Sequence, residues 1–368
     1  MKKACAKPDY LLLGDIIVLL GLGILIMASV SASLSLERFG NTYYFLKHQI
    51  LFGIIPGIFL GFIFYKINLS LLKKWSLLLI LLNLALMVLV FFPVIGSASS
   101  EFTAARWIGL GPFSFQPSEF LKITFILYLA SWLCGRTGEK MQKDLKKIFG
   151  AFLIIMVVIA LLLILQPDIS TLVVISACAL LMYFLADTPL WHIITAVSLG
   201  FLSLLFLIKM APYRVKRLLV FLNQDIDPMG MGYQLKQALI AVGSGGLFGL
   251  GLGMSKQKLG FLPQSISDSI FAIFAEEAGF LGALFLVFLF LFFLWRIFKI
   301  VKINQDKFLQ LTAVGISCWI VLQGFINLGA MIGILPLTGI PLPFISYGGS
   351  HMVAELIGVG ILLNISKS

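Results

Sequence analysis

Long apolar runs recur along this chain and are separated by short polar stretches. The runs lie at residues 11–32, 45–65, 75–95, 117–134, 148–165, 169–186, 189–208, 269–297, 308–333 and 347–365. A run of about 20 apolar residues can cross a lipid bilayer as a helix. Gly and Pro interrupt several runs, which packed membrane helices tolerate. The pattern predicts an all-α integral membrane protein with about ten transmembrane helices in one polytopic domain over residues 1–368.

The composition agrees with this pattern and excludes other classes of protein. Hydrophobic residues make up 60% of the 368 residues and charged residues 12%, against roughly 45–50% and about 25% in soluble domains. Neither an ordinary cytosolic enzyme nor a disordered chain has this balance. The first apolar run, from Tyr10 to Ala28, exceeds the about 7–15 residues of a signal peptide's apolar region. We therefore expect a retained first helix.

The distribution of basic residues predicts the orientation. An even number of spans places both termini on one side, and sixteen of the 27 Lys and Arg residues lie in loops on that side. Seven of the other eleven lie in the segment 209–268, and such long segments are largely exempt from the charge bias. We expect both termini in the cytoplasm and the chain in the cytoplasmic (inner) membrane. Basic loops, rather than nucleic-acid binding, explain the net charge of +11.

The segment 209–268 is the largest polar region of the chain. It contains a Gly-rich stretch from Gly243 through Gly253 and several apolar residues, which favour amphipathic pieces at the membrane interface. Long connecting loops of this kind are usually functional or disordered. We predict a large extracytoplasmic loop between the seventh and eighth spans that carries part of the active site.

Asp268 is the candidate catalytic carboxylate, because it stands where this loop enters the eighth span. Partial desolvation by an apolar wall would raise its pKa toward a value useful for a general base. A structural alternative remains open. Ser267 and Asp268 directly precede an apolar helix, and both residue types suit an N-cap.

Six basic residues fall on the same predicted side of the membrane and are candidates for binding a diphosphate. They are Arg106, Lys122, Arg214, Arg217, Lys256 and Lys258. Arg offers fork geometry and Lys a point charge. The alternative is that these side chains reach lipid phosphates. Glu119 stands three residues before Lys122, which predicts an intrahelical ion pair, and Asp168 is expected to contact a neighbouring helix.

Seven short strings in this order resemble one protein family. They are Ala105-Arg106-Trp107-Ile108, Gln116-Pro117-Ser118-Glu119, Gln166-Pro167-Asp168, Gly232-Tyr233-Gln234, Gly251-Leu252-Gly253-Met254-Ser255-Lys256-Gln257-Lys258, Asp268-Ser269-Ile270-Phe271-Ala272 with Glu276-Glu277, and Pro343-Phe344-Ile345-Ser346-Tyr347-Gly348-Gly349-Ser350. Together they cover nearly the whole chain and resemble the SEDS family (FtsW, RodA, SpoVE). The Gly-rich string is closer to the division branch, FtsW, than to RodA.

This resemblance implies a ten-span peptidoglycan glycosyltransferase that polymerises lipid II outside the membrane, in division or elongation. It implies a class B penicillin-binding protein and other division proteins as partners. The family's essential aspartate falls on Asp268, its arginine on Arg106 and a lysine on Lys258. Gln234 and the pair Glu119 and Lys122 join the expected substrate-binding set.

Three departures and an open question about metal accompany the resemblance. Where the family usually has Glu, often His, and Phe around the aspartate, this chain has Gln264, Ile266 and Ser269. These changes argue against a relay through those neighbours. A divalent cation (Mg²⁺ or Mn²⁺) is compatible with the reaction, but the sequence has no dedicated cluster of ligands. His and Cys residues are scattered and do not predict a zinc site.

Two other functions fit the sequence features. A carrier that flips lipid-linked precursors would also use broken helices and intramembrane charges. A scaffold for division proteins would need no catalytic residue. Product length in an assay with lipid II separates polymerisation from transport, because a carrier moves its substrate without lengthening it.

Overall fold

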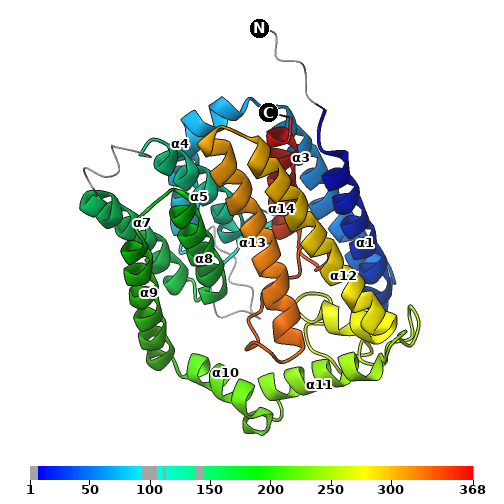
Figure 1. Ribbon diagram of the computed structural model, residues 1–368. Helices are drawn as coiled ribbons and strands as arrows, with labels where there is room; N and C mark the ends of the chain where they lie inside the picture. The colour runs from blue at the N-terminus through cyan, green and yellow to red at the C-terminus, as the bar shows by residue number, and fades with distance from the viewer. Residues whose placement is uncertain (1–6, 93–105, 111–112, 137–144, 368) are drawn as a thin grey trace.

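The computed structural model describes residues 7–92, 106–110, 113–136 and 145–367, and helices make up most of the described residues (Figure 1). The first helices are α1 (Tyr10–Phe39), α2 (Tyr44–Gln49), the π-helical η1 (Ile50–Ile54), α3 (Ile55–Lys66) and α4 (Leu69–Leu89). A hairpin of β1 (Ile108–Leu110) and β2 (Phe113–Phe115) precedes α5 (Pro117–Cys134), α7 (Leu145–Leu165), α8 (Ile169–Leu185) and α9 (Leu190–Met210). The chain continues through α10 (Pro212–Leu222), the 3-10 helix η2 (Gln224–Ile226), α11 (Met231–Ser244), α12 (Ile270–Ile303), α13 (Lys307–Met331) and α14 (Gly349–Ile365).

A helix forms in every one of the apolar runs that the sequence singled out. Among the described residues, seven helices are long and apolar enough to cross a membrane, and α8 and α14 are shorter apolar helices of 17 residues each. The end of the third run, residues 93–95, lies outside the described residues. The all-α architecture of a multi-pass membrane protein is confirmed. The count of ten spans and the side of the termini stay predictions.

The bundle has a clear centre and a clear periphery. Helix α14 is central, since every residue from Ser350 to Ile365 is buried, and α13 beside it is mostly buried as well. Helix α9 is peripheral, because His192 is its only buried residue. An apolar helix with no buried face needs a nonpolar surrounding, as lipid provides. The centre is therefore where polar groups gain protein partners.

Helix α14 approaches α3 closely through glycines. A Cβ atom added at Gly360 would lie 2.1 Å from the carbonyl oxygen of Gly61. Membrane helices pack this closely where small residues line the contact. This contact holds α3, in the first part of the chain, against the last helix.

Short polar side chains mark several helix starts. Asp9, Asn68, Asp168 and Asp306 each accept a hydrogen bond from a backbone N–H in the first turn of the helix that follows. The backbone N–H of Asp9 also donates to the Ser366 hydroxyl over 3.0 Å. The start of α1 and the end of α14 are therefore at one end of the bundle (Figure 1).

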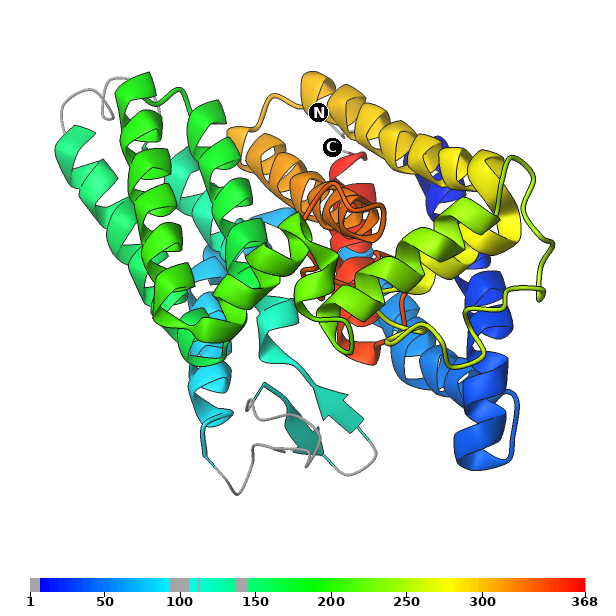
Figure 2. The ribbon, with the colours of Figure 1, turned by 90° about the horizontal axis from the view of Figure 1, so that it is seen from below.

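Helices α10 and α11 run across the opposite end of the bundle (Figures 1 and 2). They belong to the segment 209–268 that the sequence assigned to a large outer loop. Helix α11 packs on the first half of α12, and α10 joins α9 to η2. The first part of this segment therefore consists of helices that lie over the end of the bundle, and residues 245–268 follow as turns. The outward orientation of the segment stays a prediction.

A kink interrupts α12 at Gly279, whose backbone has φ of 68°. A Cβ atom there would lie 2.2 Å from the backbone nitrogen of Gly249. The Gly-rich turn, residues 243–258, supplies substitute hydrogen bonds. The N–H groups of Phe280 and Leu281 donate to the carbonyls of Gly246 and Leu247, over 2.9 and 3.1 Å. The kink and the Gly-rich stretch therefore form one unit that ties the outer segment to α12.

Candidate active site

Asp268 lies between the Gly-rich turn and α12, and hydrogen bonds from three other elements hold Asp268 and its two neighbours in the chain. Asn327 on α13 donates to the Asp268 carbonyl over 2.8 Å. The Ser346 hydroxyl donates to the Ser267 carbonyl over 2.6 Å, and Gln234 on α11 donates to the Ser269 hydroxyl over 3.1 Å. The helix α12 is preceded by Ser269 as its N-cap residue. Asp268 therefore does not cap α12, and its carboxylate is free for another task.

The Asp268 carboxylate is in a partly dry and positive environment. The side chain is half-buried, and no side chain or backbone group of the described residues donates a hydrogen bond to its carboxylate. Burial raises the pKa of Asp268 to about 6, while the Arg217 guanidinium opposes this rise. A carboxylate with this pKa is ionised near neutral pH and still basic enough to accept a proton.

Arg217 on α10 is the charged partner of Asp268. Its Nη1 donates to the Thr338 carbonyl over 3.4 Å, whereas its buried Nε has no hydrogen-bond partner. Burial lowers the pKa of Arg217, and the Asp268 carboxylate counteracts that effect. A buried N–H without a partner is costly, so Arg217 is prepared to bind an anionic ligand.

Arg106 adds a second guanidinium close to the first. It lies two residues before β1 and donates to the carbonyls of Gln166 and Pro167, which precede α8, the first over 2.8 Å. Its charge also lowers the pKa of Arg217, so the two guanidinium groups lie within electrostatic reach. Two arginines that donate to backbone carbonyls, and one carboxylate without a hydrogen-bond donor among the described residues, are suited to a ligand that carries a phosphate and a hydroxyl group.

Lys258 is placed differently from the diphosphate role that the resemblance implies. Its Nζ forms an ion pair with Glu277 on α12 at 2.8 Å and donates to the Ser29 hydroxyl on α1 over 3.1 Å. Both charged side chains are buried. Lys256 two residues earlier is exposed. Lys258 therefore joins the Gly-rich turn to two helices, and Lys256 has no described ion-pair partner.

Glu276, the neighbour of Glu277, also holds the Gly-rich turn. It accepts a hydrogen bond from the Ser255 hydroxyl and others from the backbone N–H groups of Lys256 and Gln257, over 3.3 and 3.4 Å. The two carboxylates have separate partners. They therefore do not act as a paired-carboxylate site.

The predicted ion pair between Glu119 and Lys122 on α5 is confirmed, with the Lys122 Nζ 2.8 Å from Glu119. Lys122 also donates to Gln323 on α13 over 2.9 Å and lies 5.0 Å from the centre of the Trp319 ring. Both members of the pair are buried in the bundle. Their place is inside the helix packing rather than beside Arg106.

Two other predicted residues have mainly structural contacts. Asp168 accepts a hydrogen bond from the Ser118 hydroxyl on α5 over 3.2 Å, which confirms the expected contact with a neighbouring helix. Arg214 donates to the Leu207 carbonyl over 2.8 Å and to the hydroxyl of Tyr213. Of the six basic residues, the structure therefore brings Arg217 toward Asp268 and Arg106 toward Arg217.

Sequence reasoning missed three polar residues that contact Asp268 or the segment next to it. They are Asn327, Gln323 and Glu355, all buried in α13 and α14. Each interrupts a mostly apolar stretch, and such residues in a membrane helix are functional candidates by default. That signal was available in the sequence for Glu355.

The donor set offers little for a resident metal. Among the residues that the structure describes, no three His, Cys, Asp or Glu side chains gather closely enough to hold a metal ion. A Mg²⁺ or Mn²⁺ ion beside Asp268 would draw its remaining oxygen ligands from the substrate and from water, as Mg²⁺ often does in phosphate sites.

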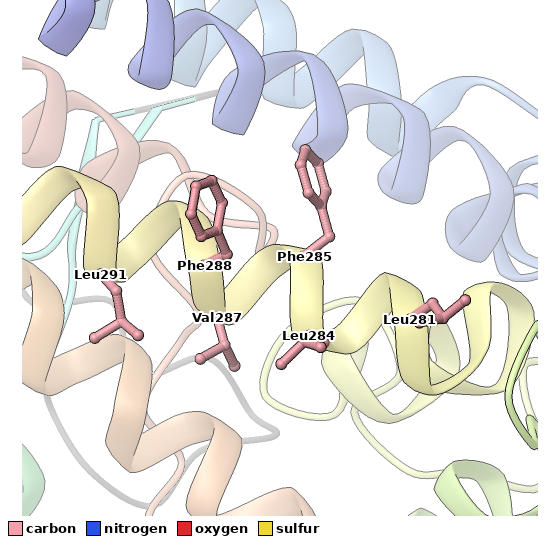
Figure 3. A pocket seen from close by; sticks show the side chains of 6 residues that line it. All are labelled: Leu281, Leu284, Phe285, Val287, Phe288 and Leu291. Atoms are coloured by element: carbon pink, nitrogen blue, oxygen red, sulfur yellow. The ribbon is translucent and has the colours of Figure 1, made fainter.

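A purely apolar groove of about 460 Å³ lies further along α12. Figure 3 shows its lining side chains: Leu281, Leu284, Phe285, Val287, Phe288 and Leu291. These residues follow the kink, on the part of α12 that lies beyond the Gly-rich turn. A groove without polar groups suits hydrocarbon chains and offers no group for acid–base chemistry.

Comparison with known proteins identifies the family. The profile of the cell cycle protein family FtsW/RodA/SpoVE matches residues 10–368. Stage V sporulation protein E of Bacillus subtilis is 38% identical over 98% of this chain and 97% of its own length. A probable peptidoglycan glycosyltransferase FtsW of Coxiella burnetii is 40% identical over 95% and 93%. A solved chain from a peptidoglycan synthase complex has the same fold, with a TM-score of 0.79, 24% identity and coverage of 98% and 97%. The chain therefore belongs to the FtsW/RodA/SpoVE (SEDS) family.

Proposed function

We propose that this protein is a peptidoglycan glycosyltransferase that polymerises lipid II at the outer face of the cytoplasmic membrane, in cell division or elongation. The observation that carries the proposal is the half-buried Asp268 carboxylate, with a pKa of about 6, beside the Arg217 guanidinium. The names of the relatives as peptidoglycan glycosyltransferases support the same activity. They do not favour the carrier alternative.

The reaction joins two lipid-linked sugars. The C4 hydroxyl of the acceptor lipid II attacks the anomeric carbon of the growing glycan, and the new C–O bond forms as the bond to the lipid diphosphate breaks. Asp268 accepts the proton of the attacking hydroxyl. The diphosphate leaves from the opposite face, so the anomeric configuration inverts. Because both substrates are anchored in lipid, a site at the end of the helix bundle suits them.

The two arginines would stabilise the charge that develops on the leaving diphosphate. Arg217 has an unpartnered Nε, and Arg106 is fixed by two backbone carbonyls. Groups that are held in place before the reaction need no reorganisation as charge develops. Gln234 orients the segment around Asp268 through Ser269. Lys258 would support the fold of the Gly-rich turn and take no part in the transfer itself.

The partners belong to the same proposal. We expect a class B penicillin-binding protein to supply the transpeptidase, together with other division proteins. The related fold of a chain from a peptidoglycan synthase complex supports a partner of this class. A third possibility, a scaffold alone, would leave the desolvated Asp268 without a task.

Purified protein with lipid II tests the activity directly. The protein, alone and with a class B penicillin-binding protein, should convert lipid II into glycan strands that form a ladder on a gel. Transport of labelled lipid II across liposomes without any lengthening would support the carrier alternative and contradict the proposal.

The pH dependence of polymerisation should report the pKa of Asp268. A general base works only when it is deprotonated, so kcat/KM should be constant above the pKa of about 6 and fall below it. At pH 5 the ionised fraction, and with it kcat/KM, should be about a tenth of the plateau. An acid limb near pH 4, as for an ordinary aspartate, would contradict the desolvated base.

Replacing Arg217 with Ala should lower kcat/KM by about 10²–10³-fold, the usual loss for one preorganised group that stabilises charge in a transition state. It should also move the acid limb to higher pH, because Arg217 opposes the rise in the pKa of Asp268. The variant Lys216→Ala on the same helix is the control. Lys216 forms an exposed ion pair with Asp227 at 3.1 Å, and its loss should leave both quantities unchanged.

A further inference from the structure

The segment 336–348, between α13 and α14, forms one wall of the candidate site. A Cβ atom at Gly339 would lie 3.3 Å from the Asp268 carboxylate. The Thr338 carbonyl accepts a hydrogen bond from Arg217, and the Tyr347 N–H donates to Ile266 over 2.9 Å. The position of this segment therefore sets the space beside Asp268 and the direction of Arg217.

This wall has no regular secondary structure of its own and contains a strained residue. Phe344 has φ of 64°, a left-handed backbone conformation that residues other than glycine seldom adopt. Such a conformation persists only where the surrounding structure enforces it. The segment therefore depends on contacts from outside.

Three buried side chains of α13 and α14 supply these contacts. Asn327 donates to the Ile340 carbonyl over 2.7 Å, and Gln323 donates to the Pro341 carbonyl over 3.1 Å. Glu355 accepts a hydrogen bond from the Phe344 N–H over 2.8 Å and another from Gln323 over 3.4 Å. Gln323 in turn accepts from Lys122. The strained residue is thus tied to a polar network in the centre of the bundle.

Glu355 is the unexpected member of this network. Its side chain is fully buried, at 0% exposure, in the middle of a mostly apolar helix. A carboxyl group at such a place is costly to desolvate, a cost that leucine would avoid. The hydrogen bond to Phe344 is the contact that leucine would lose.

We propose that Glu355 is a positioning residue for the glycosyl transfer, which holds Phe344 and thereby keeps the wall 336–348 against Asp268 and Arg217. It touches neither substrate nor the reacting atoms. The inference rests on the proposed function for its kinetic effects. The mobility of the wall can be measured without any activity.

Three variants test the proposal in full-length protein. Glu355→Leu removes the acceptor for Phe344, and Glu355→Gln keeps one. Asn364→Leu is the matched control, because Asn364 is a buried polar residue of the same helix that binds Phe64 and Ile67 over 2.9 and 2.6 Å, away from the wall. Each is compared with wild type in lipid II polymerisation and in hydrogen exchange of peptides that cover residues 336–348.

We expect Glu355→Leu to lower kcat by about 10–100-fold, as small misplacements near reacting groups do, with KM for lipid II nearly unchanged. Water that enters beside a loosened wall should move the acid limb of the pH profile from about 6 toward the ordinary value for Asp268. Exchange in 336–348 should increase. Glu355→Gln should stay within about threefold of wild type, and Asn364→Leu should change neither the limb nor this exchange.

Unchanged kcat, acid limb and exchange in Glu355→Leu would overturn the proposal. So would equal changes in Asn364→Leu, which would indicate a general loosening of α14, or an equal loss in Glu355→Gln. Failure of the proposed function has a different signature. Full activity of an Asp268→Asn variant would reject the base, while the exchange result for Glu355 would remain informative.

Discussion

The variant Asp268→Asn should lose polymerisation by about 10²–10⁴-fold in a lipid II assay, which corresponds to about 3–5 kcal/mol in the activation free energy. Asparagine has nearly the same shape but cannot accept the hydroxyl proton. The fold should persist, because the structure holds this residue through its backbone carbonyl, which Asn327 contacts. Glycan length on a gel, at equal amounts of folded protein, is the measurement.

Asp225→Asn is the control for this loss. Asp225 is an exposed carboxylate of the same outer segment, and we expect its replacement to leave the rate unchanged. If Asp268→Asn polymerises lipid II at the wild-type rate, the general base lies elsewhere. If both variants lose activity equally, the effect comes from the charge of the segment and not from proton transfer.

The helices and the candidate general base follow from local features of the sequence. Hydropathy and caps such as Asp9 and Asp306 depend on neighbouring residues, so they mark helices without knowledge of the fold. Asp268 stands out because it joins a polar segment to a long apolar run. The ion pair of Glu119 and Lys122 is equally local, since residues three positions apart on a helix lie on the same face.

The partners of the polar groups depend on tertiary packing and were less accessible. Lys258 meets Ser29, which is 229 residues away, and no local pattern predicts that meeting. Glu355 stands out in the sequence as an acidic residue in an apolar run, but only the structure shows that it contacts Phe344. The kink at Gly279 likewise results from the approach of the Gly-rich turn. What the sequence could not predict is therefore which distant segments share the centre of the bundle.

Removing the positive charge of Lys258 should strongly destabilise the protein. Lys258→Met leaves Glu277 buried without its ion-pair partner, and breaking a buried pair in this way costs about 3–5 kcal/mol. We expect a lower yield of folded protein and a thermal unfolding midpoint in detergent that falls by several degrees. The double variant Lys258→Met with Glu277→Gln should recover much of this loss, because no uncompensated charge stays buried and Ser29 can still donate to the amide oxygen.

The same variants distinguish the structural role of Lys258 from the substrate-binding role that the family resemblance implies. A lysine that binds the diphosphate would, when replaced, lower kcat/KM without lowering the unfolding midpoint, and the double variant would restore nothing. A structural lysine should behave in the opposite way: the surviving folded Lys258→Met protein should polymerise lipid II at a rate close to wild type. Its buried ion pair with Glu277 and its bond to Ser29 favour this second outcome, because a group already neutralised by a carboxylate has little charge left for a phosphate.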